Sequence, residues 1–550
     1  MWKDLFITKP IEPAPRVDAG EPVEGDLQGE ATLQRTLTAT QLMMLGIGAV
    51  IGAGIFVLTG QAAAEYAGPA IMLSFILAGV ACAFAGLCYA EFAAMLPVSG
   101  SAYSYSYATL GEFVAWFIGW CLVLEYLFAA STVAVGWSGY LNSFLGTLGL
   151  ALPDVLARAP ISRVGGEFVH TGALINLPAV FIVAAVTGLC YVGITQSAFV
   201  NSIIVAIKVT IILLFVALGF HYMDPQNLDA CHAALSAMGN FNLGAGGSLP
   251  QDIAGAAAAM GLSEQSYLIQ AERLRELVMT CAAQPEGAAL GGLVPPTTES
   301  DHYGPYGVIR AASIVFFAYI GFDAVSTAAG EARNPQRDMP IGILGSLVLC
   351  TIIYILVCAA LVGLMPFSLL GTDRPVATAL EAHPQLLWLK TFVEIAAIAG
   401  LSSVILVMLM AQPRIFYTMS RDGLLPKLFG KVHPKFHTPY IGTIIVGVVA
   451  ATLAGFLPIN LLGEMVSMGT LLAFATVCAG VLILRYTKPD VHRPFRVPLA
   501  IVICPLGVAS CLYLFSQPFR EYWGLFLGWT LIGMLIYACY GYRHSKLRQR

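Results

Sequence analysis

The sequence predicts an all-α polytopic membrane protein with about twelve transmembrane helices, and two observations carry that prediction. The chain of 550 residues is 58% hydrophobic and only 11% charged, whereas soluble domains contain about 25% charged residues. Its charged residues are also far apart, with none between Arg35 and Glu65 and none between Glu167 and Lys208. Because a spanning helix needs about 20 mostly apolar residues, each gap is long enough to hold one.

Charge gaps and turn residues divide the chain into apolar runs of spanning length. The predicted spans are residues 41–62, 68–95, 113–145, 173–193, 198–220, 307–330, 340–364, 390–419, 440–457, 461–485, 498–516 and 522–542. They form two units of five helices, residues 38–222 and 307–486, and a final pair within 487–543. The remaining segments are an N-terminal tail (1–37), a long loop (223–306) and a C-terminal tail (544–550).

Lysine and arginine residues predict the orientation, because they gather in cytoplasmic segments. With the N-terminus inside, the inside segments hold 19 of the 28 Lys and Arg residues and the outside segments hold seven. Residues 1–37 are polar and Pro-rich, without the apolar core of a signal peptide. We therefore expect an inner (plasma) membrane protein with an even number of spans and both termini in the cytoplasm.

The loop 223–306 is the main segment expected outside the membrane. Its stretch from Ser263 to Cys281 has the pattern of an amphipathic helix. Cys231 and Cys281 both lie in this loop, where the compartment permits a disulfide, so their pairing is a hypothesis. The other ten cysteines lie in or beside predicted spans, and none of the twelve forms a C-x-x-C pair. We expect neither a metal nor another cofactor.

The first predicted span holds four glycines within Gly46-Ile-Gly48-Ala-Val-Ile-Gly52-Ala-Gly54-Ile-Phe56. One interpretation is close helix packing, because Gly48 and Gly52 have small-xxx-small spacing. The other is a broken helix, which a membrane tolerates only where the backbone lines a cavity. The N–H groups that open the outer half-helix would then point at an anionic group. These candidate donors are Gly52, Ala53, Gly54 and Ile55.

The sixth predicted span has one glycine and one acid within Val315-Phe-Phe-Ala-Tyr-Ile-Gly321-Phe-Asp323. A break here would present free carbonyl groups to a substrate ammonium. The first and sixth spans are the two expected to be discontinuous when five-helix units repeat with inverted topology. An odd number of spans in each unit forces that inversion, so the argument is topological.

Six motifs follow one another in the order of a known family. They are Gly46-Ile-Gly-Ala-Val-Ile-Gly-Ala-Gly-Ile-Phe56, Tyr89-Ala-Glu91-Phe, Pro97-Val-Ser-Gly-Ser-Ala-Tyr-Ser-Tyr-Ser-Tyr107, Phe316-Phe-Ala-Tyr-Ile-Gly-Phe-Asp323, Asn334-Pro-Gln-Arg-Asp-Met-Pro340 and Arg421-Asp-Gly-Leu-Leu-Pro426. Over roughly residues 35–490 the chain resembles the amino acid–polyamine–organocation superfamily, and within it the bacterial relatives of the cationic amino-acid transporters. The resemblance implies a 5+5 inverted-repeat fold, similar to the leucine transporter, with spans 1 and 6 unwound and two further helices.

The same resemblance implies a substrate site at the middle of the membrane. In such proteins the glycine stretch of span 1 holds the substrate carboxylate, and main-chain carbonyls of spans 1 and 6 hold its amino group. The residues carried over are Val50, Gly52, Ala53 and Gly54 on the carboxylate side, and Phe317, Ala318 and Ile320 on the amino side. Phe317 is similar to the aromatic gate over the substrate. The family often has Ser or Thr at the position of Ala53, so that hydroxyl contact is expected to be missing.

Lys208 places a charge in the middle of the fifth predicted span. An intramembrane charge marks a functional site by default, and the apolar residues on both sides make it hard for the amine to reach an interface by snorkelling. In proton-linked relatives of this fold, a span-5 lysine resembles a replacement for the sodium ion that bridges spans 1 and 8. Lys208 matches that position, with Ser402 and Ser403 of span 8 as expected neighbours, and would gain and lose a proton during transport.

Four of the acids in predicted spans also have an expected role. The family counterpart of Glu125 hydrogen-bonds near the first-span break, which implies shaping of the site or a proton relay; the alternative is a neutral core acid. Asp323 is expected either as a carboxylate beside the substrate or as a structural partner of Lys208. Glu91 is expected to tie the second span to a cytoplasmic loop, and Glu464 is expected at an interface.

These features predict a secondary active amino-acid transporter that is proton-coupled and works by alternating access. Cationic and small neutral amino acids both remain open as substrates. An amino-acid/polyamine exchanger and a non-transporting amino-acid receptor remain alternatives. Membrane lipids are expected partners, whereas the net charge of −4 argues against nucleic acid.

A membrane enzyme is the alternative from a different class. The motif Gly136-Trp-Ser138-Gly139 matches the G-x-S-G pattern of rhomboid proteases. Such a serine needs a histidine within reach as its general base, and no His lies deep in any predicted span. We therefore expect no enzymatic activity.

Overall fold

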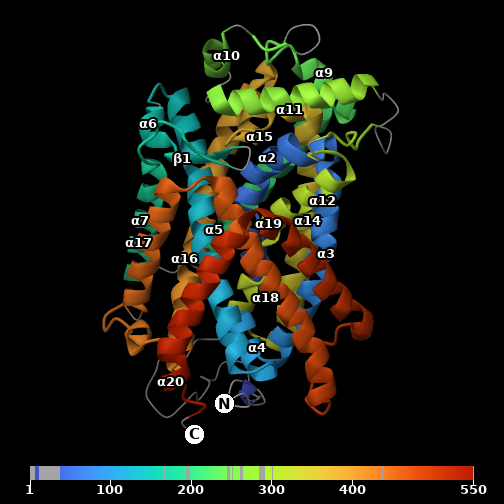
Figure 1. Ribbon diagram of the computed structural model, residues 1–550. Helices are drawn as coiled ribbons and strands as arrows, with labels where there is room; N and C mark the ends of the chain where they lie inside the picture. The colour runs from blue at the N-terminus through green and yellow to red at the C-terminus, as the bar shows by residue number, and fades with distance from the viewer. Residues whose placement is uncertain are drawn as a thin grey trace.

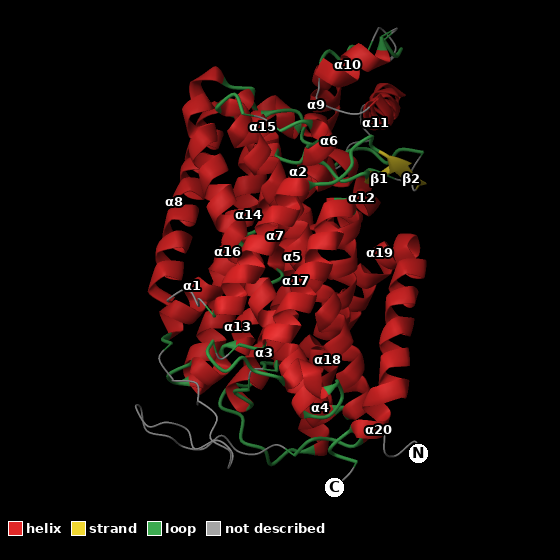
Figure 2. Cartoon of the chain, turned by 90° about the vertical axis from the view of Figure 1, so that its left-hand side faces the viewer, coloured by secondary structure: helices red, strands yellow, loops and turns green. Residues whose placement is uncertain are grey.

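The computed structural model describes residues 6–10, 37–98, 100–150, 152–164, 167–193, 198–243, 248–250, 252–259, 264–283, 292–299, 302–436 and 438–548. Most of the expected N-terminal tail, the last two residues of the chain and residues 194–197, between the fourth and fifth predicted spans, lie outside this set. The described chain is a bundle of long helices with short elements at its two ends (Figures 1 and 2). We call the end near both chain termini the tail end and the opposite end the loop end.

The bundle is built from helices that are long and apolar, and eight described helical segments meet the length and hydropathy of a membrane span. The long helices are α3 (Ile71–Met95), α5 (Glu112–Thr147), α8 (Ala198–Tyr222), α14 (Pro335–Leu364), α16 (Leu387–Arg421), α18 (Ile459–Thr487) and α19 (Ala500–Ile536). Shorter apolar helices are α1 (Ala39–Val50), α7 (Leu177–Val192) and α17 (Tyr440–Phe456). Exposed apolar side chains such as Ile352 on α14 and Val448 on α17 are typical of a surface that faces lipid. The protein is therefore an all-helical integral membrane protein, with one small hairpin as its described β-structure.

Short elements cap the bundle. At the loop end lie α6 (Asp154–Ala157), the antiparallel strands β1 (Ile161–Val164) and β2 (Glu167–His170), α9 (Ala230–Ala237), α10 (Ile253–Ala259), α11 (Glu264–Ala283) and α15 (Pro375–Glu381). At the tail end lie α4 (Ser101–Thr109) and α20 (Tyr542–His544). Further 3-10 and π turns are η4 (Gly68–Ala70), η5 (Pro225–Leu228), η7 (Ala329–Glu331), η8 (Phe367–Leu369), η9 (Pro384–Leu386), η10 (Lys427–Gly430) and η11 (Tyr537–Gly541).

The loop-end helix α11 confirms the amphipathic helix predicted between Ser263 and Cys281. The hypothetical disulfide is also formed, because Cys231 of α9 is bonded to Cys281 of α11. This bond closes a segment of 50 residues and joins α11 to α9 across the top of the bundle in Figure 1. The predicted outer loop is thus a small helical cap rather than a structureless insertion.

The last two predicted spans are the two arms of the single element α19. Its backbone leaves helical geometry at Tyr522 (φ −115°, ψ 17°), four residues after Pro518, whose ring interrupts the helix hydrogen bonds. Both arms reach the tail end, where the Val497 N–H donates to Glu91 at 2.7 Å and the Tyr537 hydroxyl donates to Glu112 at 2.9 Å. The element therefore runs away from the tail end, bends and returns to it, as the orange and red ribbons of Figure 1 show.

The first predicted span is interrupted after Val50. There the backbone of Ile51 turns extended (φ −72°, ψ 90°) and ends α1. Helical structure resumes with a π-helix, η2 (Gly54–Leu58), and continues through α2 (Thr59–Ala62) and a second π-helix, η3 (Ala63–Ala67). The glycine-rich run thus adopts the broken-helix alternative, with the break next to Gly52.

The sixth predicted span is interrupted as well. Helix α12 (Gly304–Val315) passes into one 3-10 turn, η6 (Phe316–Tyr319), and the chain then becomes extended at Ile320 (ψ 134°). Gly321 follows with a φ of +118°, a conformation that favours glycine. A short helix, α13 (Ala324–Thr327), completes the span.

Candidate functional site

The two interrupted helices meet in the interior of the bundle, and glycine allows the contact. A Cβ atom added to Gly54 would lie 2.2 Å from the Cα of Ala318, and one added to Gly321 would lie 2.8 Å from the carbonyl carbon of Ala49. Because real Cβ atoms do not approach other atoms so closely, each break is held against the other by a residue without a side chain. The broken backbones therefore face one another at close range.

A small cavity of about 10 Å³ lies between the two breaks. Its lining residues are Ala49, Val50, Gly52, Ala53, Gly54, Ala129, Val133, Phe317, Ile320, Val404 and Met408. Six residues expected at the substrate site from the sequence are among them: Val50, Gly52, Ala53, Gly54, Phe317 and Ile320. Ile55 and Ala318 lie directly beside this set, Ala318 against Gly54. This volume has room for about one water molecule, so the cavity is too small for an amino acid in this conformation.

The cavity is bordered by backbone amides that open a helix. The first N–H groups of a helix have no carbonyl partner within it, and Ala53 supplies no side-chain cap to η2. The carbonyl of Gly52 accepts from the Phe56 N–H at 3.4 Å, and the carbonyl of Gly54 accepts from the Thr59 hydroxyl at 2.9 Å. The amide end of η2 thus faces the cavity and favours an anionic group there.

Tyr354 of α14 joins the two breaks. Its buried hydroxyl lies 2.7 Å from the carbonyl oxygen of Val50 and 2.9 Å from that of Ala318, and can donate to either. A carbonyl freed from a helix inside a membrane needs a hydrogen-bond donor. The one Tyr354 hydroxyl is within donating distance of a freed carbonyl from each of the two interrupted helices. The relative position of the two half-helices is therefore set from α14.

Lys208 occupies the interior of α8 and reaches the first break. Its side chain is 1% exposed, and its Nζ donates to the carbonyl oxygens of Gly48 at 3.1 Å and Ile51 at 2.9 Å. On the α16 side it packs against Gly400, where an added Cβ would lie 2.6 Å from the lysine Cδ. The amine thus caps the end of α1 with a positive charge, as the carbonyl end of a helix favours.

The expected serine neighbours of Lys208 take part in other contacts. Ser402 accepts from the Trp137 indole N–H at 2.9 Å and donates to the Ile398 carbonyl. The Ser403 hydroxyl donates to the carbonyl of Gly400, on its own helix, at 2.8 Å. The sequence did not anticipate that the amine bonds to main-chain carbonyls and packs on a glycine of α16, because a glycine presents no side chain to suggest a partner.

Asp323 and Glu125 form a buried acidic pair, and neither is bonded to Lys208. Asp323 accepts from the Tyr126 hydroxyl at 2.8 Å and from the Gly321 N–H at 3.2 Å, which rules out the expected structural pairing with Lys208. Glu125 lies beside Asp323 and Thr470, and both of its carboxyl oxygens are buried. A buried carboxylate is costly unless a donor or a proton offsets its charge.

Comparison with known proteins decides the family. A sequence model of the family described as "Amino acid permease" matches residues 37–540, which is nearly the whole chain. The chain belongs to the amino acid permease family. The permease also matches proteins named as permeases and transporters along most of its length.

Three relatives illustrate the range of named substrates. The permease is 41% identical to the branched-chain amino acid permease BcaP of Bacillus subtilis, over 95% of this chain and 96% of the relative. It is 40% identical to a methylthioribose transporter of the same organism, over 94% and 96%. It is 35% identical to cationic amino acid transporter 4, vacuolar, of Arabidopsis thaliana, over 86% and 67%.

The sequence did not single out two tyrosines of the permease that the structure brings to the breaks. Tyr126 bonds to Asp323, and Tyr354 bonds to the carbonyls beside the cavity. Both side chains are fully buried. A polar hydroxyl in the middle of an apolar span is a weak signal, because a tyrosine near an interface looks the same in the sequence.

Proposed function

We propose that this permease is a secondary active amino-acid transporter that works by alternating access around the cavity between the two breaks. The carboxylate of the substrate binds the amide end of η2 at residues 52–55, and its amino group binds main-chain carbonyls of the two breaks. The observation that carries the proposal is the convergence of six expected residues on one cavity lined by both interrupted helices. Phe317, which lines that cavity, acts as the gate.

The proposed architecture is a 5+5 inverted repeat with twelve crossings. Residues 38–222 and 307–486 form the two units, residues 487–543 add a hairpin, and 223–306 is an extracytoplasmic cap. Support comes from the interruptions in the first helix of each unit and from both chain ends lying at the tail end. In this arrangement the tail end is cytoplasmic, and the protein resides in the inner membrane with its C-terminal residues 544–550 inside.

The substrate side chain is proposed to be small or branched and apolar. The cavity walls beyond the backbone are Ala129, Val133, Val404 and Met408, so no acid among them meets a cationic side chain. Burial of apolar surface against such walls contributes about 25 cal/mol per Å². The name of the Bacillus relative, a branched-chain amino acid permease, points the same way, whereas the plant relative's name keeps cationic amino acids as the second candidate.

Coupling to protons is proposed to run through Lys208. Its ammonium stands on the carbonyl end of α1 at the break, where loss of a proton would release both carbonyls and loosen the half-helix. Glu125 and Asp323 are the proposed relay acids on the other side of the breaks, and Ser402 and Ser403 keep α16 in place next to the lysine. Protonation and substrate binding would then act on the same short piece of backbone.

A binding screen followed by uptake tests the proposal. Purified protein is heated with each of the twenty amino acids, because a ligand of the folded state raises the Tm. Ligands that pass are then assayed as labelled substrates in proteoliposomes with an imposed pH gradient, against protein-free liposomes. Binding without uptake would identify a receptor. Uptake that requires a second substrate inside the vesicles would identify an exchanger. Uptake that needs sodium and ignores the pH gradient would exclude the proton mechanism.

A further inference from the structure

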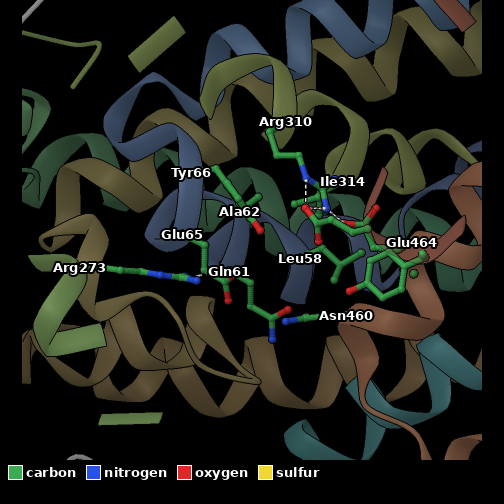
Figure 3. A pocket seen from close by; sticks show the side chains of 13 residues that line it. Leu58, Gln61, Ala62, Glu65, Tyr66, Arg273, Arg310, Ile314, Asn460 and Glu464 are labelled. Carbon is green, nitrogen blue, oxygen red and sulfur yellow. Dashed lines mark hydrogen bonds and ion pairs between the residues drawn. The ribbon is translucent and has the colours of Figure 1, made fainter. Parts of the chain in front are cut away.

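A second cavity, of about 80 Å³, lies between the outer half of the first span and the loop end (Figure 3). It is lined by residues of η2, α2, η3, α12 and α18, by the bend of α19, and by one residue of the cap helix α11. Its polar and charged lining residues are Gln61, Glu65, Tyr66, Arg273, Arg310, Asn460, Glu464, Glu521 and Tyr522. This cavity is separate from the one between the breaks and shares no lining residue with it.

Arg310 is already engaged on one wall of this cavity. Its guanidinium contacts Glu464 at 2.6 Å and Glu521 at 3.1 Å, and it stacks 5.4 Å from the centre of the Tyr66 ring. In Figure 3 the Arg310 and Glu464 side chains meet across dashed lines. Glu464 is buried in this ion pair between α12 and α18, a partner that the sequence did not predict.

Several acceptor oxygens around the cavity remain without a donor among the described residues. Glu464 uses only Oε1 for Arg310, and its Oε2 has no hydrogen-bond partner in the described protein; the same holds for Oε1 of Gln61. Both side chains are more than nine-tenths buried, at 5% and 9% exposure. Glu65 adds a third acceptor, whose contact with Arg273 is long at 3.7 Å. Because a buried acceptor without a donor costs free energy, these oxygens favour a ligand that brings donors.

We propose that this loop-end cavity binds an organic ammonium group. Its three carboxylates, Glu65, Glu464 and Glu521, outnumber its two guanidinium groups, so it carries one net negative charge. A primary ammonium supplies a positive charge and three N–H donors, which matches the acceptors left open. Among the described residues, no group of three or more His, Cys, Asp or Glu side chains is arranged to hold a metal ion.

The position of the cavity assigns it a role on the substrate path. Gln61 follows Gly54 by seven residues of helical backbone, or roughly 10 Å along the axis. Between them, Leu58 of η2 lines the loop-end cavity. An amine held at Gln61 and Glu65 would thus wait about two turns from the cavity between the breaks. This role as an antechamber rests on the proposed transport function, whereas the ammonium site itself does not.

Thermal stability with carboxylate-free probes tests the site. Ethylammonium chloride should raise the Tm of the purified wild-type protein by about 1–2 °C at saturation. This shift should exceed the shift that equal concentrations of tetramethylammonium, sodium or calcium chloride produce. Gln61→Leu and Glu65→Gln should abolish that shift, and the control Glu272→Gln, on the exposed side of α11, should retain it. An equal effect of sodium or calcium would identify a metal site and overturn the proposal, as would an ethylammonium shift that both cavity variants keep.

Measuring the Tm shift with leucine separates the transport proposal from the ammonium-site proposal. Its carboxylate directs it to the amide end of η2, so leucine should still stabilise Gln61→Leu and Glu65→Gln. If none of the twenty amino acids stabilises the wild type while ethylammonium does, the transport proposal fails and the ammonium site stands. If both bind, uptake by Gln61→Leu should show a KM raised several-fold with kcat unchanged; an unchanged KM would refute the antechamber role.

Discussion

Single glycines decide how closely the two interrupted helices approach. Gly54 contacts the Ala318 backbone so closely that even a methyl group would overlap it. Gly528 on the second arm of α19 is exposed and has open space around it. The two positions look alike in composition, since both lie in apolar spans, but only Gly54 is constrained by a neighbour.

We predict that Gly54→Ala lowers the Tm and removes amino-acid binding, because overpacking a tight contact costs about 1–3 kcal/mol. Gly528→Ala serves as the matched control and should behave like wild type or slightly better, because alanine favours helices. Thermal unfolding with and without ligand measures both effects. Wild-type binding by Gly54→Ala would show that the breaks need not touch.

His302 makes the loop end sensitive to pH. Burial and the neighbouring charge of Arg273 lower its pKa to about 4, and Glu276, Glu521, Arg310 and the ring of Tyr66 also face it. Because an unfolded histidine has a pKa of about 6.5, the unfolded state binds more protons between these values. The contribution of His302 to stability is therefore complete above pH ~6.5 and is lost as the pH falls toward 4.

Hydrogen exchange checks this expectation at the cap. After correction for the intrinsic rates, amides of α11 should exchange faster at pH 5 than at pH 7.5. The variant His302→Gln should lose most of this difference, whereas His232→Gln, which changes an exposed histidine of α9, should keep it. Equal pH dependence in the two variants would assign the effect to other groups.

At the scale of elements, α14 organises the two breaks without being broken itself. It packs against both α1 and α3, and Tyr354 from its middle reaches the carbonyls of Val50 and Ala318. The two interrupted helices are thus both held by hydrogen bonds from one unbroken neighbouring helix. Movement of either half-helix must break or exchange that hydroxyl contact.

We predict that Tyr354→Phe weakens substrate binding several-fold while the protein still folds. Removing the hydroxyl leaves buried carbonyl oxygens without a donor, at about 1–3 kcal/mol. Tyr486→Phe, at a side chain that is 71% exposed, is the control. Calorimetric titration of the best ligand measures the change, and unaltered affinity in Tyr354→Phe would remove this residue from the site.

At the scale of the whole molecule, the tail end is closed by both chain termini. Lys9 pairs with Asp422 at 2.9 Å, and Arg548 pairs at 2.8 Å with Glu112, which also accepts from Tyr537. At the loop end, α11 is tied by its disulfide and by Arg273. Ion pairs and the cap helix therefore cover the two ends of the bundle.

We predict that Lys208→Met lowers accumulation driven by a pH gradient by about tenfold or more, because a hydrogen bond from a charged group is worth about 1.5–3 kcal/mol. Lys427→Met, which changes an exposed lysine of the tail end, should leave accumulation unchanged. Counterflow measured on the same vesicles should persist in Lys208→Met if the lysine serves coupling. Full accumulation by that variant would exclude Lys208 from coupling.

Most helices and both breaks were predictable from the sequence. Charge-free runs set the helices, because hydrocarbon admits few charges, and the glycine run and Gly321 marked the interruptions. The partners of buried groups were not predictable. Asp323 meets Tyr126 and not Lys208, and Glu464 meets Arg310, because such contacts depend on how distant helices rotate toward one another.

The sequence by itself determined that this chain is a helical membrane protein with a glycine-rich break in its first span and a lysine in its fifth. These properties follow from local chemistry, since apolar length, backbone freedom and an intramembrane charge are each visible in a short stretch. Only the tertiary structure decided what the lysine holds, which tyrosine joins the breaks and where a second cavity lies. Those features arise between residues on different helices, from 36 to 304 positions apart, and packing geometry alone brings their atoms within hydrogen-bond distance.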